Sequence, residues 1–132
     1  FYKLHLAIQE WNSKNKTSEV VFGIDHKGTS IQALQYALSN FDTTKVLHVN
    51  YATFHPKLYI FWGDTKATIY YGSSNFTSGG LETNFEGGTI QEFDLPQEEA
   101  LFHDALESYS SIADASLSCV SILSTEVLQN RL

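Results

Sequence analysis

The sequence contains no methionine and only one cysteine, Cys119, among its 132 residues. A single cysteine cannot form an internal disulfide, and it offers no paired-cysteine zinc pattern, which fits a reducing compartment. No apolar run approaches the roughly 18 residues needed to span a bilayer, and residues 1–11 are too polar for a signal peptide. These features predict a cytoplasmic protein without a membrane partner. The absence of methionine and the start at Phe1 indicate a fragment of a longer protein.

Basic residues are scarce as well: Lys and Arg number 8 against 15 Asp and Glu, and the net charge is −7. Such a charge argues against nonspecific coating of nucleic acid, because proteins that do this are normally basic. The imbalance lies in residues 67–132, which hold one arginine and ten acids, whereas residues 1–66 hold seven lysines and five acids. We expect phosphate to meet the first half, and the acidic half either to contact a basic partner or to be a solvated surface.

The hydrophobic pattern predicts an α/β fold. An amphipathic helix is expected near residues 1–11, a strand at 20–24, a helix from Ile31 to about Asn40, and a strand at 45–50. A strand, a helix and a strand in this order imply a parallel crossover. No repeat or linker divides the chain, so we expect one domain over residues 1–132, built on a mixed, largely parallel β-sheet flanked by helices.

The middle of the chain predicts a β-hairpin followed by further elements. Strands at 57–62 and 67–73 flank a Gly-Asp turn. Another strand is expected at 84–93, then a helix beginning at Pro96, and a weakly patterned tail that is compatible with a helix. The hairpin would return Gly72 and the residues after it to the start of its first strand.

That start carries His55 and Lys57. Side chains two residues apart on a strand point to the same face, so both could reach one phosphate. His55 could act as nucleophile or proton donor, since imidazole titrates near neutral pH. Lys57 could neutralise phosphate charge. Each residue taken alone is better explained as a polar strand end, and only the combination with later residues favours a site.

Those later residues lie between Gly72 and Glu86. The Gly72-Ser73 turn could expose backbone amides and a hydroxyl, and the Asn75 amide could donate to a phosphoryl oxygen. Glu86 could orient His55 as a carboxylate does in a catalytic triad. The remaining candidates for substrate contact are Ser74, Thr77 and Asn84, the last of which is expected to share a strand face with Glu86. Alternatively, Asn75 and Thr77 merely cap a turn and Glu86 is an ordinary strand residue.

The spacing of these residues resembles the half-site of the phospholipase D superfamily, in which His-any-Lys is followed after the next strand by Gly-Gly/Ser-any-Asn. The matching residues are His55, Lys57, Gly72, Ser73 and Asn75. The continuation from Thr77 to Glu86 is similar to the nuclease branch, which includes metal-independent restriction endonucleases and helicase-associated domains. The aspartate that phospholipases usually keep after the lysine is absent here, which favours a nuclease over a lipase.

The resemblance implies a metal-independent phosphodiesterase that uses a phosphohistidine intermediate and needs no cofactor. Superfamily members pair two half-sites, and this chain has one, so a homodimer would have to bring His55 and Lys57 of both copies to one site. The expected partner is nucleic acid, with DNA favoured. The other histidines lack the spaced partners of a metal site. The second candidate is a non-catalytic nucleic-acid-binding or dimerisation module attached to a helicase or another effector.

Overall fold

The computed structural model describes residues 4–24, 29–49, 57–75, 77, 79–110 and 113–131. The chain divides into two compact units. The first unit comprises Phe1–His55 and Ala113–Leu132, and the second unit comprises Pro56–Ile112. Each unit has its own small β-sheet and its own apolar core.

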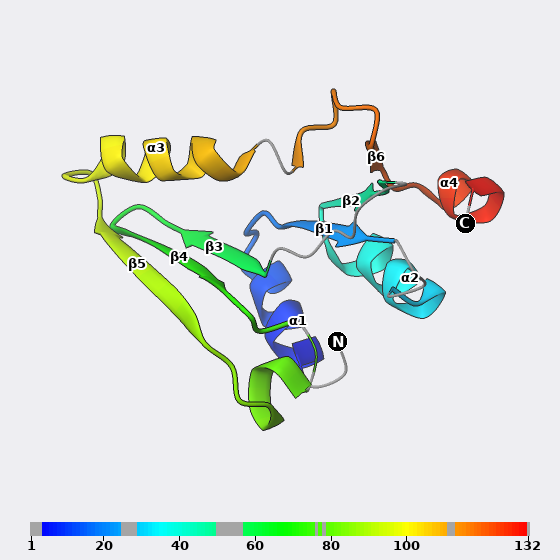
Figure 1. Ribbon diagram of the computed structural model, residues 1–132, viewed down its shortest axis with the longest axis horizontal. Helices are drawn as coiled ribbons and strands as arrows, with labels where there is room; N and C mark the ends of the chain where they lie inside the picture. Colours follow the sequence, from blue (N-terminus) through cyan, green and yellow to red (C-terminus); the bar gives the residue numbers. More distant parts are fainter. Residues whose placement is uncertain are drawn as a thin grey trace. The chain divides into compact units, whose positions relative to one another are not determined.

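The first unit contains a three-stranded mixed sheet with the order β1-β2-β6 (Figure 1). Strands β1 and β2 are parallel and β2 and β6 are antiparallel. Helix α2 begins after Ser30, whose hydroxyl accepts a hydrogen bond from the Ala33 amide and so caps the helix. The elements of this unit are α1 (His5–Ser13), β1 (Glu19–Gly23), α2 (Ile31–Asn40), β2 (Thr43–Leu47), β6 (Val120–Ile122) and α4 (Thr125–Arg131).

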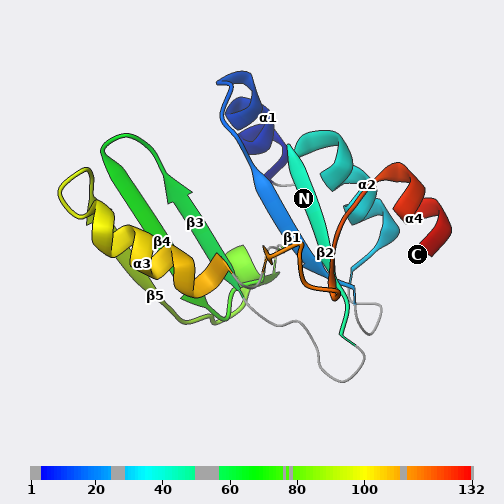
Figure 2. The same cartoon turned by 90° about the horizontal axis from the view of Figure 1, so that it is seen from above.

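The core of the first unit forms between its sheet and the helices α2 and α4, which lie beside each other in Figure 2. Leu34 of α2, Val46 of β2 and Leu123 after β6 are buried together. Partly buried apolar side chains surround them, namely Phe22, Ile24, Leu38, Val127 and Leu128. Burial of this apolar surface is what holds a short parallel pair and a three-residue edge strand in place.

The second unit is an antiparallel sheet with the order β3-β4-β5, and helix α3 lies along one of its faces (Figure 2). Ala67 and Ile69 of β4 point to that face and are buried against Phe102 of α3. A period of two thus selects the core residues of the strand. The elements are β3 (Leu58–Trp62), β4 (Lys66–Gly72), the π-helical turn η3 (Gly79–Thr83), β5 (Gly88–Asp94) and α3 (Glu99–Ser110).

The predicted fold class is wrong: the described residues form two small three-stranded sheets, one mixed and one entirely antiparallel, instead of a single, largely parallel sheet. Among the strands that the structure describes, parallel pairing is confined to β1 and β2, which a helix connects as predicted. The described parts of the connections from β3 to β5 contain no such crossover: a tight turn joins β3 to β4, and after the longer segment 73–87 strand β5 pairs antiparallel with β4. The predicted hairpin is confirmed, with Leu58 paired to Tyr71 and Trp62 to Ala67.

Several boundaries also differ from the prediction. The third strand of the second unit begins at Gly88, not at Asn84, and α3 begins at Glu99, after a turn that contains Pro96. The sequence pattern missed β6, because three residues are too few to establish a period. None of the helices within the described ranges is both long and apolar enough to cross a membrane.

The core of the second unit can be tested at Phe102, which is 3% exposed and lies with its ring centroid 5.6 Å from that of Phe93. We expect Phe102→Ala to lower the free energy of unfolding by about 3 to 5 kcal/mol, because it removes a buried ring and leaves a cavity. The neighbouring Leu101 is 58% exposed, so Leu101→Ala is a matched control that should change little. Urea unfolding monitored by circular dichroism measures both, and equal losses would contradict this assignment of the core.

Candidate functional site

The backbone brings the ends of three strands together at one end of the second unit. Gly72 closes β4, and its amide donates a 3.1 Å hydrogen bond to the carbonyl of Lys57, which directly precedes β3. One residue further on, the Ser73 amide donates a 2.9 Å hydrogen bond to the carbonyl of Gly87, which directly precedes β5. The antiparallel registers therefore continue past the strands, with Lys57 opposite Gly72 on one side of the β4 extension and Ser73 beside the segment that carries Glu86 on the other.

Three polar side chains meet there. The Ser73 hydroxyl donates to one oxygen of the Glu86 carboxylate, and the Asn84 side-chain amide donates to the other oxygen at 3.3 Å. The Ser73 oxygen in turn accepts a 3.0 Å hydrogen bond from the Gly87 amide. These hydrogen bonds fix the orientation of the three side chains. All three are exposed at the end of the sheet, so a ligand has access to them.

Lys57 belongs to the same group electrostatically. Desolvation lowers the pKa of the half-buried Lys57, and the negative charge of Glu86 acts in the opposite direction. The carboxylate thus favours the charged ammonium form of Lys57, which is the form that binds a phosphate oxygen. The negative charge of an anionic ligand would act on the Lys57 ammonium in the same direction as that of Glu86.

Two tyrosines fix the position of Ser74. The Tyr59 hydroxyl donates to the Ser74 carbonyl at 2.8 Å, and the Tyr70 hydroxyl lies 2.9 Å from the Ser74 hydroxyl. Desolvation raises the pKa of Tyr59, and the neighbouring Tyr70 adds to that effect, so the Tyr59 phenol is kept protonated as a donor. Ser74, a predicted substrate-binding residue, therefore has both its carbonyl and its hydroxyl in contact with tyrosines that anchor the loop.

Glycines at the sheet end leave room for Tyr70. A Cβ atom added at Gly88 would lie 2.6 Å from the Tyr70 ring, and one added at Gly72 would lie 2.7 Å from the Cα atom of Gly88. Real Cβ contacts are not this short, so close packing of Tyr70 and of adjacent backbones requires glycine at both positions. The sequence pattern predicted that Gly72 exposes backbone amides to a ligand; in the structure the absence of a side chain at Gly72 allows close packing within the protein itself.

Asn75 and Thr77 begin the turn that leads into η3. The Thr77 amide donates to the Asn75 carbonyl at 2.8 Å, and the Thr77 hydroxyl accepts from the Gly80 amide at 3.1 Å. The Thr77 hydroxyl thus stabilises the turn, which agrees with the turn-capping alternative for this residue. The Asn75 side chain is exposed, and its backbone packs against Gly80, where a Cβ would collide with it.

The structure thus brings together Lys57, Gly72, Ser73, Asn84 and Glu86 from the predicted set. His55, the predicted nucleophile, lies outside the described residues. Asn84 and Glu86 do not share a strand face as predicted, because they precede β5, but they contact each other directly. Within the described ranges, no group of three or more His, Cys, Asp or Glu side chains is arranged to hold a metal ion.

Sequence reasoning missed the structural role of Tyr59, Tyr70 and the Gly87-Gly88 pair. Tyrosines on a predicted strand are most simply interpreted as core residues, so their hydroxyl contacts were not expected. Two consecutive glycines directly after Glu86 are the signal that could have indicated a close backbone approach at this point of the sheet. Comparison with known proteins adds nothing to this site: no protein-family model matches the sequence, and no curated protein is significantly similar to it.

The close packing at the sheet end predicts that Gly72→Ala lowers the free energy of unfolding by about 1 to 3 kcal/mol, since the added methyl group meets backbone that cannot move freely. Gly63 in the β3-β4 turn provides the control, because a Cβ there would have no atom within 4 Å. Gly63→Ala should leave the stability nearly unchanged. Thermal unfolding of the two variants is the measurement, and a Gly72→Ala variant as stable as Gly63→Ala would refute the packing described here.

Proposed function

We propose that this chain is a metal-independent phosphodiesterase that hydrolyses nucleic-acid phosphodiester bonds at the end of the β3-β4-β5 sheet. The observation that supports the proposal best is the convergence of Lys57, Ser73 and Glu86 at that end through the bonds of Gly72 and Ser73 to neighbouring strands. Support for the reaction type comes from the resemblance to phospholipase D-like nucleases at His55, Lys57, Gly72, Ser73 and Asn75. The overall fold lends no support, since the predicted largely parallel sheet is absent.

In the proposed reaction a neutral ring nitrogen of His55 attacks the phosphorus atom. A nitrogen–phosphorus bond forms, the bond from phosphorus to the leaving oxygen breaks, and the leaving oxygen takes a proton from a second histidine. Water then attacks the phosphohistidine, transfers a proton to that second histidine, and releases His55. Lys57 and Asn75 would stabilise the charge on the phosphoryl oxygens, and Ser73 would add its hydroxyl when Glu86 releases it.

The second histidine must come from another half-site, because the chain carries the motif once. A twofold dimer supplies His55 of a second copy as the proton donor and doubles the number of lysines around the phosphate. The second unit is acidic, since residues 56–112 hold two lysines and nine acids, and a dimer would offset this acidity locally. Two copies of Lys57 at one point concentrate positive charge where the bond is cleaved, although the rest of the unit repels a nucleic acid.

The second candidate is a non-catalytic nucleic-acid-binding or dimerisation module of a larger protein. The observation that favours it is that Ser73, Asn84 and Glu86 already bind one another, so the carboxylate must be displaced before the serine can donate to a phosphate. The acid excess of the second unit also fits a surface that meets a basic partner domain. Activity on a simple phosphodiester separates the two functions.

We expect His55→Ala to abolish hydrolysis of bis(p-nitrophenyl) phosphate, because the imidazole forms the covalent intermediate. The matched control is His103→Ala, which removes an exposed imidazole on α3 whose ring nitrogen lies 3.6 Å from a Glu99 oxygen. The release of p-nitrophenol, followed by absorbance, gives both rates. Residual activity of His55→Ala within roughly tenfold of the wild-type rate would refute the assignment, since loss of a nucleophile costs far more.

Mixing wild-type chains with inactive His55→Ala chains tests the shared site. If each site needs both copies of His55, heterodimers are inactive and the total rate falls as the square of the wild-type fraction once subunits have exchanged. Sedimentation of the same mixtures measures the fraction of dimer. A rate that falls linearly with the wild-type fraction, or a monomer that cleaves, would show that one chain is sufficient.

A further inference from the structure

Strand β6 pairs with β2 on one edge, and no strand of the described residues pairs with its other edge. In its pairing with β2, the His48 amide donates to the Cys119 carbonyl at 2.9 Å and the Leu123 amide donates to the Thr44 carbonyl at 2.8 Å. Backbone hydrogen bonds to one neighbour involve every second residue of an antiparallel strand. Cys119, Ser121 and Leu123 therefore direct their backbone groups toward β2, whereas Val120 and Ile122 direct theirs away from it. The Val120 amide is satisfied by the Leu117 carbonyl at 3.0 Å.

Three backbone groups on that edge therefore face outward: the carbonyl of Val120 and both the amide and the carbonyl of Ile122. They have no hydrogen-bond partner among the described residues. An unpaired edge of this kind is a template for another extended segment, which could form three backbone hydrogen bonds with it. The Ile122 side chain is 59% exposed at the same place, so the edge is accessible within the first unit.

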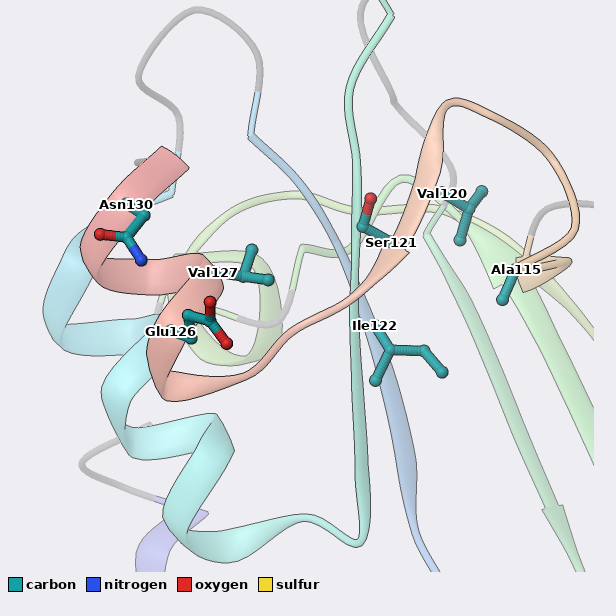
Figure 3. Close-up of a pocket in the computed structure, with 7 residues that line it drawn as sticks. All are labelled: Ala115, Val120, Ser121, Ile122, Glu126, Val127 and Asn130. Carbon is teal, nitrogen blue, oxygen red and sulfur yellow. The ribbon is translucent and has the colours of Figure 1, made fainter.

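A groove of about 470 Å³ runs along this edge. The register puts Val120 and Ile122 on one face of the sheet, whereas Ser121 lies on the other face with Val46. A cavity lined from both faces of a strand must lie on the edge of that strand. In Figure 3, Val127 of α4 points toward β6 and Glu126 lies beside it, so that α4 contributes one wall of the groove; the full lining is Ala115, Val120, Ser121, Ile122, Glu126, Val127 and Asn130.

The chemistry of the lining indicates what kind of side chain fits. Val127 and Ile122 offer apolar surface, and Glu126 is the one charged residue among the seven that line the groove. A carboxylate beside an apolar wall suits a lysine or arginine, whose methylene stem packs on the wall while its charged end meets the acid. Glu126 lies in the first turn of α4, where it also stabilises the helix dipole, and that role alone would require no partner.

We propose that the open edge of β6 binds an extended, basic peptide segment by β-strand addition. The residue opposite Ile122 would form the paired backbone hydrogen bonds and place its side chain on the Ile122 face. Its two neighbours in the peptide would point to the α4 face, because side chains alternate, and a basic side chain there would meet Glu126. The binding site is separate from the proposed phosphodiesterase chemistry and does not depend on it.

The test uses an amidated pentapeptide, Thr-Lys-Val-Lys-Thr, with fluorescein on its N-terminus, titrated with the intact chain and followed by fluorescence anisotropy. We expect saturable binding. N-methylation of the central valine, which removes one donor without changing charge, should weaken binding at least tenfold. Ile122→Pro should do the same, because proline removes an outward amide and leaves the pairing with β2 intact.

The contribution of charge is tested by Glu126→Gln, which should weaken binding of the lysine peptide several-fold but leave binding of a Thr-Gln-Val-Gln-Thr peptide unchanged. The matched control is Glu10→Gln, the same substitution on the exposed face of α1, where Glu10 pairs with Lys14. It should alter neither affinity. A purely structural role for Glu126 would lower the stability of the fold without distinguishing the two peptides.

Three results would overturn the proposal. The first is no binding of the lysine peptide to a folded wild-type chain. The second is equal affinity for the N-methylated peptide, which would mean binding without strand addition. The third is concentration-dependent dimerisation that Ile122→Pro abolishes while the peptide fails to compete, which would make a second copy of the chain the occupant of the edge.

Discussion

The hydrogen bond from the Gly72 amide to the Lys57 carbonyl is the contact on which the candidate site depends. It extends the β3-β4 register by one residue beyond the strands and fixes where the chain leaves the sheet. The Ser73 bonds to Gly87 then follow at the next position and bring in Glu86. A slip of one residue would turn every side chain of β4 to the opposite face, so the same register that buries Ile69 also aligns the polar groups.

Glycine makes this alignment possible because it leaves room for the side chain of Tyr70 and for the neighbouring backbone. The Tyr70 side chain packs against Gly72 and Gly88. Together with Tyr59 it forms hydrogen bonds that fix the position of Ser74. The loop after β4 therefore begins from a rigid point. A site that must hold a phosphoryl group benefits from such an anchor, since mispositioned donors lose much of their effect on a transition state. Helix α3 supplies the rigidity on the other face by covering β4.

The hairpin and the β1-α2-β2 crossover could be predicted from the sequence because their signals are local. Two β-rich runs on either side of the Gly63-Asp64 turn specify the hairpin, and the Ser30 cap followed by an apolar stripe specifies α2. The hairpin alone was enough to predict that Gly72 returns to Lys57. What the sequence did not reveal is how the strands distribute between sheets, since the pairing of β2 with β6 joins residues more than seventy positions apart. Local periodicity carries no information on such pairing.

The same limit applies within the site. Glu86 was predicted to orient His55, and its described contacts are Ser73 and Asn84, with an electrostatic effect on Lys57. These contacts arise because the segment before β5 is irregular. The sequence pattern predicted that this segment was already part of a strand at 84–93. The hydrogen bonds of Tyr59 and Tyr70 to Ser74 were not predicted for a related reason. An aromatic residue on a strand is most simply interpreted as a core residue, and only the glycines packed against Tyr70 indicate another role.

The central claim, covalent catalysis at this sheet end, is tested most directly by trapping the intermediate. The chain is mixed with bis(p-nitrophenyl) phosphate in buffer containing EDTA and quenched in alkali, because phosphohistidine is stable to base and labile to acid. Mass spectrometry of the digested protein then locates the label. The account predicts a p-nitrophenyl phosphate adduct on the peptide that contains His55, which is absent from the His55→Ala variant. An adduct on another residue, or hydrolysis that requires an added metal ion, would contradict it.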